Sequence, residues 1–174
     1  YGLGDKPGCL NKRGYSYINW NTDDPDPHVD SFKSLYKSIP FFMVLGDSSC
    51  YGLLADNTYK TTFDFGCENE AYYFVEHQKG CLDYYVIPGE DPKAVVHSYT
   101  MLTGTTPLQQ RWIYGNHQSR WSYFTQEEVE ALAEEFGKRD IPCDVIHMDI
   151  DYMQGYRVFT FDDQKYPNVQ KLSQ

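Results

Sequence analysis

A single stretch decides the fold of this chain: RWIYGNHQSRWSY at residues 111–123, TQEEVEALAEEFGKR at residues 125–139 and CDVIHMDIDYM at residues 143–153. Its pattern predicts a strand, a helix and a second strand, with polar and aromatic residues gathered just past each strand. The first strand is expected near Trp112. This order is typical of a parallel sheet whose strands are joined by helices.

Three signals predict the helix between the two strands. Thr125 and Glu128 have the spacing of a capping box, in which the threonine hydroxyl accepts a hydrogen bond from a first-turn amide and the glutamate reaches back. Gly137 and Pro142 are expected to end the helix. Apolar residues recur at helical spacing on one face, namely Val129, Leu132, Ala133 and Phe136.

The second strand, residues 145–148, is short and mostly apolar, as expected of a strand buried on both faces in a parallel sheet. Asp149 follows it directly and is therefore predicted to lie at the C-terminal end of a strand. In β/α barrels and open α/β sheets, ligands bind at that edge. Asp149 is thus a candidate site residue, and the alternative is that Asp149 or Asp151 only caps a loop.

The first half of the chain has a different pattern. Five runs rich in β-branched and aromatic residues, separated by turn residues, predict an antiparallel β-sandwich. Asp91 as the cap and Pro92 at the first helical position then begin a linking helix. The runs are residues 41–45, 51–55, 58–65, 71–76 and 82–87.

The pattern changes from all-β to β/α near residue 104, which predicts two domains. Residues 1–103 are expected to form part of a β-sandwich domain with its linking helix, and residues 104–174 the start of a β/α domain. Near the end, residues 155–161 are expected to form a loop with a short β ribbon, and another helix is expected to begin near Tyr166.

Composition excludes several classes of partner. The formal net charge is −10 and no cluster of Lys and Arg is present, which argues against a nucleic acid or an anionic membrane. Because the cysteines lack CxxC spacing and the histidines are scattered, we expect reduced thiols, a cytoplasmic location, no metal site and no cofactor. The cysteines are Cys9, Cys50, Cys67, Cys81 and Cys143.

Taken together, these motifs resemble glycoside hydrolase family 31, the α-glucosidase family. HQSRWSY at residues 117–123 and DIDYM at residues 149–153 are similar to the first two barrel strands of that family. WNTDDP at residues 20–25, LYKSIPFF at residues 35–42 and DNTYKTTF at residues 56–63 resemble the N-terminal β-sandwich of bacterial members. The resemblance covers essentially the whole chain and implies a sandwich followed by the first two β/α units of an incomplete (β/α)8 barrel.

The resemblance also implies a sugar pocket to which Asp23, Asp149, Ile150 and Trp121 contribute. Asp149 is expected to accept hydrogen bonds from hydroxyls of the non-reducing glucose, with Ile150 lining the wall beside it. Asp23 lies in a loop expected to reach over the barrel mouth, and a register shift of one would give its role to Asp24. Trp121 is expected near the next sugar unit, with packing beneath its loop as the alternative.

No catalytic residue is expected in this chain. Retaining glycosidases use two carboxyl groups about 5 Å apart, and the resemblance implies that both lie on later barrel strands, the nucleophile in a Trp-x-Asp-Met-Asn-Glu-like stretch that does not occur here. A barrel also needs eight strands and about 250 residues. We therefore expect a fragment, inactive by itself, of an exo-acting α-glucosidase that removes terminal α-linked glucose from small oligosaccharides. His117 and Arg120 are expected to support the strand ends.

Other functions stay open. Asp149 and Asp151 form a DxD, which holds a divalent metal in nucleotide-sugar glycosyltransferases, although no upstream nucleotide fold is indicated. A non-catalytic carbohydrate-binding module is a second alternative, and the β/α unit argues against it. α-Xylosidases, transglucosidases and α-glucan lyases share the family scaffold, but the Asp149-Ile150 pair and Trp121 favour glucose.

Overall fold

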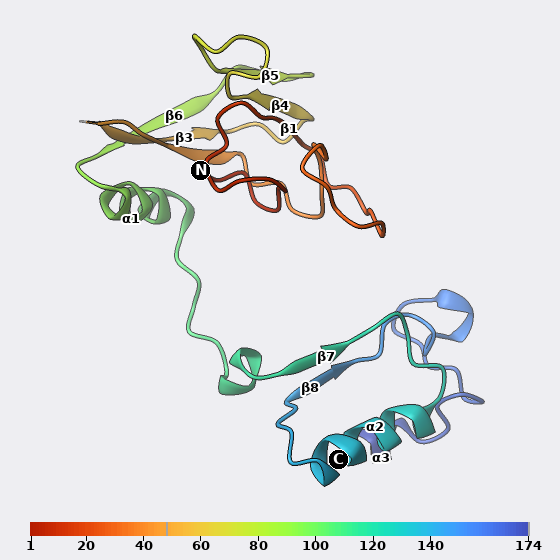
Figure 1. Cartoon of the computed structure of the whole chain (residues 1–174). Helices are drawn as coiled ribbons and strands as arrows, with labels where there is room; N and C mark the ends of the chain where they lie inside the picture. The colour runs from red at the N-terminus through yellow and green to blue at the C-terminus, as the bar shows by residue number, and fades with distance from the viewer. Residues whose placement is uncertain (48, 174) are drawn as a thin grey trace. The chain divides into compact units, whose positions relative to one another are not determined.

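The computed structural model describes residues 1–47 and 49–173, and the chain divides into two compact units. The first unit is Tyr1–Thr105 and the second is Thr106–Gln174 (Figure 1). The change from an all-β to a β/α sequence pattern predicts this boundary between residues 103 and 104.

Two antiparallel three-stranded sheets form the first unit. One sheet has the order β1 (Ser16–Asn19), β4 (Thr61–Asp64) and β5 (Phe74–His77). The other has the order β2 (Phe41–Leu45), β3 (Cys50–Ala55) and β6 (Tyr84–Gly89). The prediction of a β-rich first half is confirmed, although β1 was not foreseen.

Alternation along β2 builds two cores on the two faces of its sheet. Phe42 packs with Tyr17 and Phe63 of the other sheet, and its ring meets that of Phe63 edge-on at 6.0 Å. Phe41, the preceding residue, points to the opposite face and packs with Val95 of α1 (Pro92–Thr103). One sheet therefore lies between the second sheet and a helix.

The predicted start of α1 is confirmed. The side chain of Asp91 accepts a hydrogen bond from the N–H of Ala94 at 2.8 Å, and Pro92 is the first helical residue. The helix ends at Thr103, and its C-cap is Gly104, whose φ of 91° is accessible to glycine because it has no Cβ.

Three predicted strands begin too early, those at residues 58–65, 71–76 and 82–87, and asparagine side chains explain the first two errors. Asn57 Oδ1 accepts a hydrogen bond from the N–H of Tyr59 at 2.8 Å, so residues 58–60 turn before β4 begins. Asn69 Oδ1 accepts in the same way from Ala71 at 2.9 Å, ahead of β5. A side-chain oxygen that accepts a hydrogen bond from the backbone N–H two residues later in the chain stabilises a turn, and this turn competes with strand formation.

The second unit contains the predicted strand, helix and strand. β7 (His117–Ser119) and β8 (Val145–His147) pair in parallel, with Gln118 opposite Ile146. α2 (Gln126–Lys138) joins them, as a parallel connection requires. Tyr123, Val129 and Tyr166 form the buried core of this unit. The short helix α3 (Val169–Leu172) lies near the C-terminal end of the described residues.

The first strand is not where the sequence analysis expected it. Trp112 lies in the short 3-10 helix η1 (Arg111–Tyr114), held by hydrogen bonds from Ile113 N–H to Gln110 O and from Gly115 N–H to Trp112 O. Local bonds of this kind curl an apolar run that has strand-like composition. The extended backbone begins only at β7.

Two further expectations are wrong in detail. Val145 and Ile146 are half-buried and His147 is exposed, so β8 is not buried on both faces. Residues 155–161 do not form a β ribbon. The first two belong to the turn η2 (Gln154–Tyr156), and φ is positive at Tyr156 and Phe159. Positive φ interrupts an extended strand.

Across residues 1–47 and 49–173, no helix is long and apolar enough to span a bilayer.

Candidate functional site

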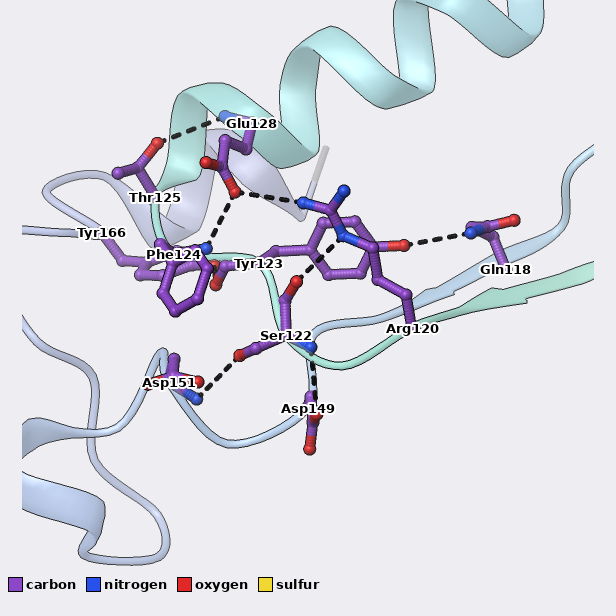
Figure 2. A network of polar contacts seen from close by, with 10 residues as sticks. All are labelled: Gln118, Arg120, Ser122, Tyr123, Phe124, Thr125, Glu128, Asp149, Asp151 and Tyr166. Atoms are coloured by element: carbon purple, nitrogen blue, oxygen red, sulfur yellow. Dashed lines mark hydrogen bonds and ion pairs between the residues drawn. The ribbon is translucent and has the colours of Figure 1, made fainter. Parts of the chain in front are cut away.

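Asp149 lies two residues beyond the end of β8, as predicted, and is exposed. Its Oδ2 accepts a hydrogen bond from the backbone N–H of Ser122 at 3.0 Å (Figure 2). Ser122 follows β7 and is fully buried. Both residues have positive φ, 63° and 65°, so two left-handed turns beyond neighbouring strands are joined by one carboxylate. In the described part of the chain, no donor reaches the other oxygen of Asp149.

Asp151 has different hydrogen-bond partners, which connect the loop after β8 to Ser122 and Tyr156. Its backbone N–H donates to Ser122 Oγ at 3.3 Å, and its Oδ1 accepts from the Tyr156 hydroxyl at 3.1 Å. Hydrogen bonding with the Ser122 side chain, followed by that with Tyr156, lowers the pKa of Asp151 below its ordinary value. Ser122 therefore contacts both residues: its backbone N–H donates to the Asp149 carboxylate, and its hydroxyl accepts from the Asp151 backbone N–H.

Arg120 fixes the backbone that carries Ser122. Its Nε donates to Ser122 O at 2.9 Å, its guanidinium lies 4.4 Å from the centre of the Tyr123 ring, and its Nη2 is 3.4 Å from Glu128 Oε2. These contacts agree with a supporting position at the end of β7.

The predicted capping box is present with one change. Thr125 Oγ1 accepts a hydrogen bond from Glu128 N–H at 3.3 Å. Glu128 reaches back to the N–H of Phe124 at 2.9 Å rather than to that of Thr125 (Figure 2). The start of α2 is therefore tied to the residue that follows Tyr123, and through Arg120 to the loop of Ser122.

Two other predicted site residues of the second unit present apolar surface. The Trp121 ring is 87% exposed, so it does not pack beneath its loop. Ile150 is 48% exposed and follows Asp149 directly. A ring, an aliphatic side chain and a carboxylate thus come from the loops beyond β7 and β8.

Asp23 lies in the first unit, in the irregular loop after β1, and is exposed. The neighbouring Asp24 is a turn residue, because its Oδ1 accepts from Asp26 N–H at 3.1 Å and its carbonyl accepts from the Tyr36 hydroxyl. Within the described residues, no hydrogen bond occupies the Asp23 side chain. The two carboxylates are therefore distinguishable: that of Asp24 stabilises its own turn, and that of Asp23 has no hydrogen bond within the described residues.

His117 lies beside His147 of the neighbouring strand. Their Nδ1 and Nε2 atoms are 3.0 Å apart, and His117 Nε2 is 3.3 Å from Trp112 O. Among residues 1–47 and 49–173, no group of three or more His, Cys, Asp and Glu side chains is placed to hold a metal ion.

Ser122 is the residue that the sequence analysis missed. It connects Asp149, Asp151 and Arg120, and its role depends on a left-handed backbone and on the side-by-side placement of two strands. A serine in a polar loop gives no periodic or compositional signal for either feature.

Two family models match the chain. Residues 106–174 match the glycosyl hydrolases family 31 TIM-barrel domain, and residues 1–64 match the glycosyl hydrolase 31 N-terminal galactose mutarotase-like domain. Among curated proteins, alpha-glucosidase 2 of Bacillus thermoamyloliquefaciens is 49% identical over 99% of this chain and 22% of its own length. An alpha-xylosidase of Lactiplantibacillus pentosus is 31% identical over 99% of this chain and 22% of its own length.

Solved structures of family 31 enzymes are also similar to this chain. A family 31 dextranase of Flavobacterium johnsoniae, complexed with isomaltotriose, superposes with a TM-score of 0.88 at 40% identity over 99% of this chain and 21% of that chain. A family 31 alpha-glucosidase of Bacteroides thetaiotaomicron superposes with a TM-score of 0.83 at 37% identity, over 97% of this chain and 28% of that chain. The chain spans about a fifth of the length of the curated relatives cited.

Proposed function

The chain belongs to glycosyl hydrolase family 31, and from this premise we propose that it supplies part of the substrate pocket of a retaining, exo-acting α-glucosidase. The substrate is the terminal non-reducing glucose of a small α-linked oligosaccharide. The observation that carries the proposal is the 49% identity with an alpha-glucosidase along almost the whole chain.

The geometry of Asp149 supports its role as a sugar-binding residue. One oxygen is held by Ser122 N–H, which fixes the orientation of the carboxylate. The other oxygen accepts hydrogen bonds from sugar hydroxyls, and each bond to a charged group contributes roughly 1.5–3 kcal/mol. Ile150 lines the wall beside it. A carboxylate here also places negative charge near a developing oxocarbenium ion.

The test uses the complete gene product that contains these residues, with p-nitrophenyl α-glucoside and maltose as substrates. Asp149→Asn retains an oxygen for Ser122 N–H and a residue type that tolerates positive φ, so it removes charge with little disturbance of the loop. We expect kcat/KM to fall roughly 10- to 100-fold, the loss of about one charged hydrogen bond. Absence of α-glucosidase activity in the complete protein would refute the assignment.

The alpha-xylosidase relative supports a second candidate within the family. The two activities differ in the hydroxymethyl group of glucose, which xylose lacks. Comparison of kcat/KM for p-nitrophenyl α-glucoside and α-xyloside separates them. A higher value for the xyloside would replace α-glucosidase by α-xylosidase as the function.

We propose that the 174 residues alone have no hydrolase activity, because retaining hydrolysis needs a nucleophile and an acid/base that this chain does not supply. Turnover by the purified chain would contradict this. For the complete protein, NMR spectra of the first sugar released should show the α-anomer, and initial release of the β-anomer would indicate inversion.

Asp23 and Trp121 are proposed as further sugar contacts. Asp23→Asn should raise KM for maltose, whereas Asp24→Asn preserves an oxygen for Asp26 N–H and should leave KM unchanged. Trp121→Ala should raise KM for maltotriose more than KM for the aryl glucoside, because stacking on the next sugar unit is lost. Equal effects of Asp23→Asn and Asp24→Asn would argue against the assignment to Asp23.

A cytoplasmic location is also proposed. Cys9, Cys67 and Cys81 are exposed thiols, and Cys50 and Cys143 are half-buried. Thiols of this exposure remain reduced in the cytoplasm. Cell fractionation with an antibody to the chain tests this, and recovery from the extracellular medium would contradict it.

A further inference from the structure

A cavity in the first unit lies outside the residues assigned above. Its volume is about 430 Å³, within the range of small-ligand sites. It is bordered by the end of β1, by Ser38 and by the turn that precedes β4. Its lining contains no charged side chain, so a neutral ligand suits it better than an ion.

Asn19 lines this cavity and is only 7% exposed. Within the described part of the chain, its side-chain oxygen and nitrogen both have no hydrogen-bond partner, and the same holds for Ser38 Oγ. Thr61 of β4, which pairs with Asn19 of β1, is buried in the same sheet but does have hydrogen-bond partners. Its hydroxyl bonds to Tyr59 O at 2.9 Å and to His77 Nδ1 at 2.8 Å.

Buried polar atoms in native proteins are nearly always hydrogen-bonded. The three atoms have almost no accessible surface, so a polar partner that enters the cavity reaches them when the Asn19 and Ser38 side chains turn toward it. An asparagine amide both donates and accepts, and a serine hydroxyl does the same. This combination matches neighbouring hydroxyl groups, which also both donate and accept.

Two aromatic rings border the same cavity. Trp20 is 54% exposed and Tyr59 is 51% exposed. Half-exposed rings next to neutral hydrogen-bonding groups suit a ligand with an apolar face and a hydroxylated edge. A pyranose ring has both.

We propose that this cavity binds one pyranose ring of a neutral saccharide, with Asn19 and Ser38 hydrogen-bonding to its hydroxyls and the rings of Trp20 and Tyr59 contacting its apolar face. The site lies in the first unit and requires no turnover. The choice of an α-glucoside as one probe rests on the proposed function, and the site itself does not.

The experiment is an NMR titration of the isotope-labelled chain with maltose and, separately, with lactose. We expect saturable shifts of the Asn19 side-chain amide and the Trp20 indole for at least one of the two sugars. Trp20→Ala and Ser38→Ala should each weaken binding about tenfold, the effect of about 1.4 kcal/mol. Tyr72→Ala, which removes a half-exposed ring that does not line this cavity, should leave binding unchanged.

Two results would overturn the proposal. One is that neither sugar shifts these signals, in which case only water occupies the cavity. The other is wild-type affinity in both Trp20→Ala and Ser38→Ala, measured on variants whose spectra show an intact first unit. Because the readout is binding, failure of the hydrolase assays leaves this titration unaffected, and failure of the titration leaves the Asp149 proposal intact.

Discussion

The carboxylate of Asp149 accepts a hydrogen bond from the backbone N–H of Ser122 at 3.0 Å, although 27 positions separate the two residues. Each follows a different strand of the parallel pair, and each has positive φ. The bond therefore holds together two loops that the strands alone would leave independent.

Asp149→Ala should destabilise the second unit by about 2 kcal/mol, because the charged acceptor is lost and alanine must take a left-handed conformation. Asp149→Asn retains an acceptor and tolerates that conformation, so its free energy of unfolding should stay close to that of the wild type. Urea unfolding of both variants measures this. Equal stability of Asp149→Ala and the wild type would show that the bond contributes nothing to the loops.

Asp151 gives a prediction about pH. Its pKa is lowered in the folded chain, chiefly by hydrogen bonding with Ser122, whereas the pKa of an aspartate in an unfolded chain is about 3.9. The stabilisation is therefore present above that unfolded value and is lost as the pH falls through the lowered folded value. Asp151→Asn should remove this part of the pH dependence. Urea midpoints between pH 2 and 7 measure it, and parallel profiles for the two proteins would contradict the prediction.

Thr125 gives a prediction about the start of α2. Thr125→Ala removes the acceptor of Glu128 N–H and should cost about 1 kcal/mol, whereas Thr125→Ser retains a hydroxyl and should cost less. Amide hydrogen exchange in the first turn of α2 measures the effect locally. Unchanged exchange at Glu128 in Thr125→Ala would mean that the cap does not hold the helix start.

Local signals explain what could be predicted from the sequence. α2 lies where capping and apolar spacing put it, because helix start and periodicity depend on residues close in the chain. The strand expected near Trp112 is a 3-10 helix, although Ile113 and Tyr114 are residue types common in strands. Composition does not distinguish an extended run from a 3-10 helix, and the hydrogen bonds of η1 decide between them.

The candidate site was predictable only in part, for a related reason. The position of Asp149 beyond a strand follows from the order of apolar and acidic residues. Its link to Ser122 depends on the parallel pairing of β7 and β8 and on two residues with positive φ. Non-glycine residues adopt such φ values through tertiary contacts, which spacing along the chain does not encode.

Gly137 is a site where stability should increase. It lies inside α2, and a Cβ added there would meet no atom within 4 Å. Glycine in a helix interior is less favourable than alanine by about 0.5–1 kcal/mol. Because Gly137 is the second-last residue of α2, Gly137→Ala should raise the free energy of unfolding of the second unit by at most that amount. Urea unfolding measures the change, and a loss of stability would contradict the open surroundings found here.

Gly52→Ala should have the opposite effect in the first unit. A Cβ at Gly52 would lie 2.6 Å from Cε2 of Phe41 and 2.9 Å from Cγ1 of Val95. Phe41 has little room to move, because its ring is stacked on that of Tyr99 at 4.0 Å. Overpacking of this kind costs about 1–3 kcal/mol, and amide exchange in α1 should accelerate as the helix is pushed from the sheet.

A double-mutant cycle identifies the cause. Phe41→Leu shortens the side chain that the new methyl group meets, so Gly52→Ala should cost less in the Phe41→Leu background than in the wild type. Strictly additive costs would mean that the methyl group does not collide with Phe41, and that the loss of stability arises from the contact with Val95 or in the strand backbone instead. A coupling that favours the double variant would show that the collision with Phe41 causes the loss, and that the close packing of Phe41 on β3 depends on the absence of a side chain at position 52.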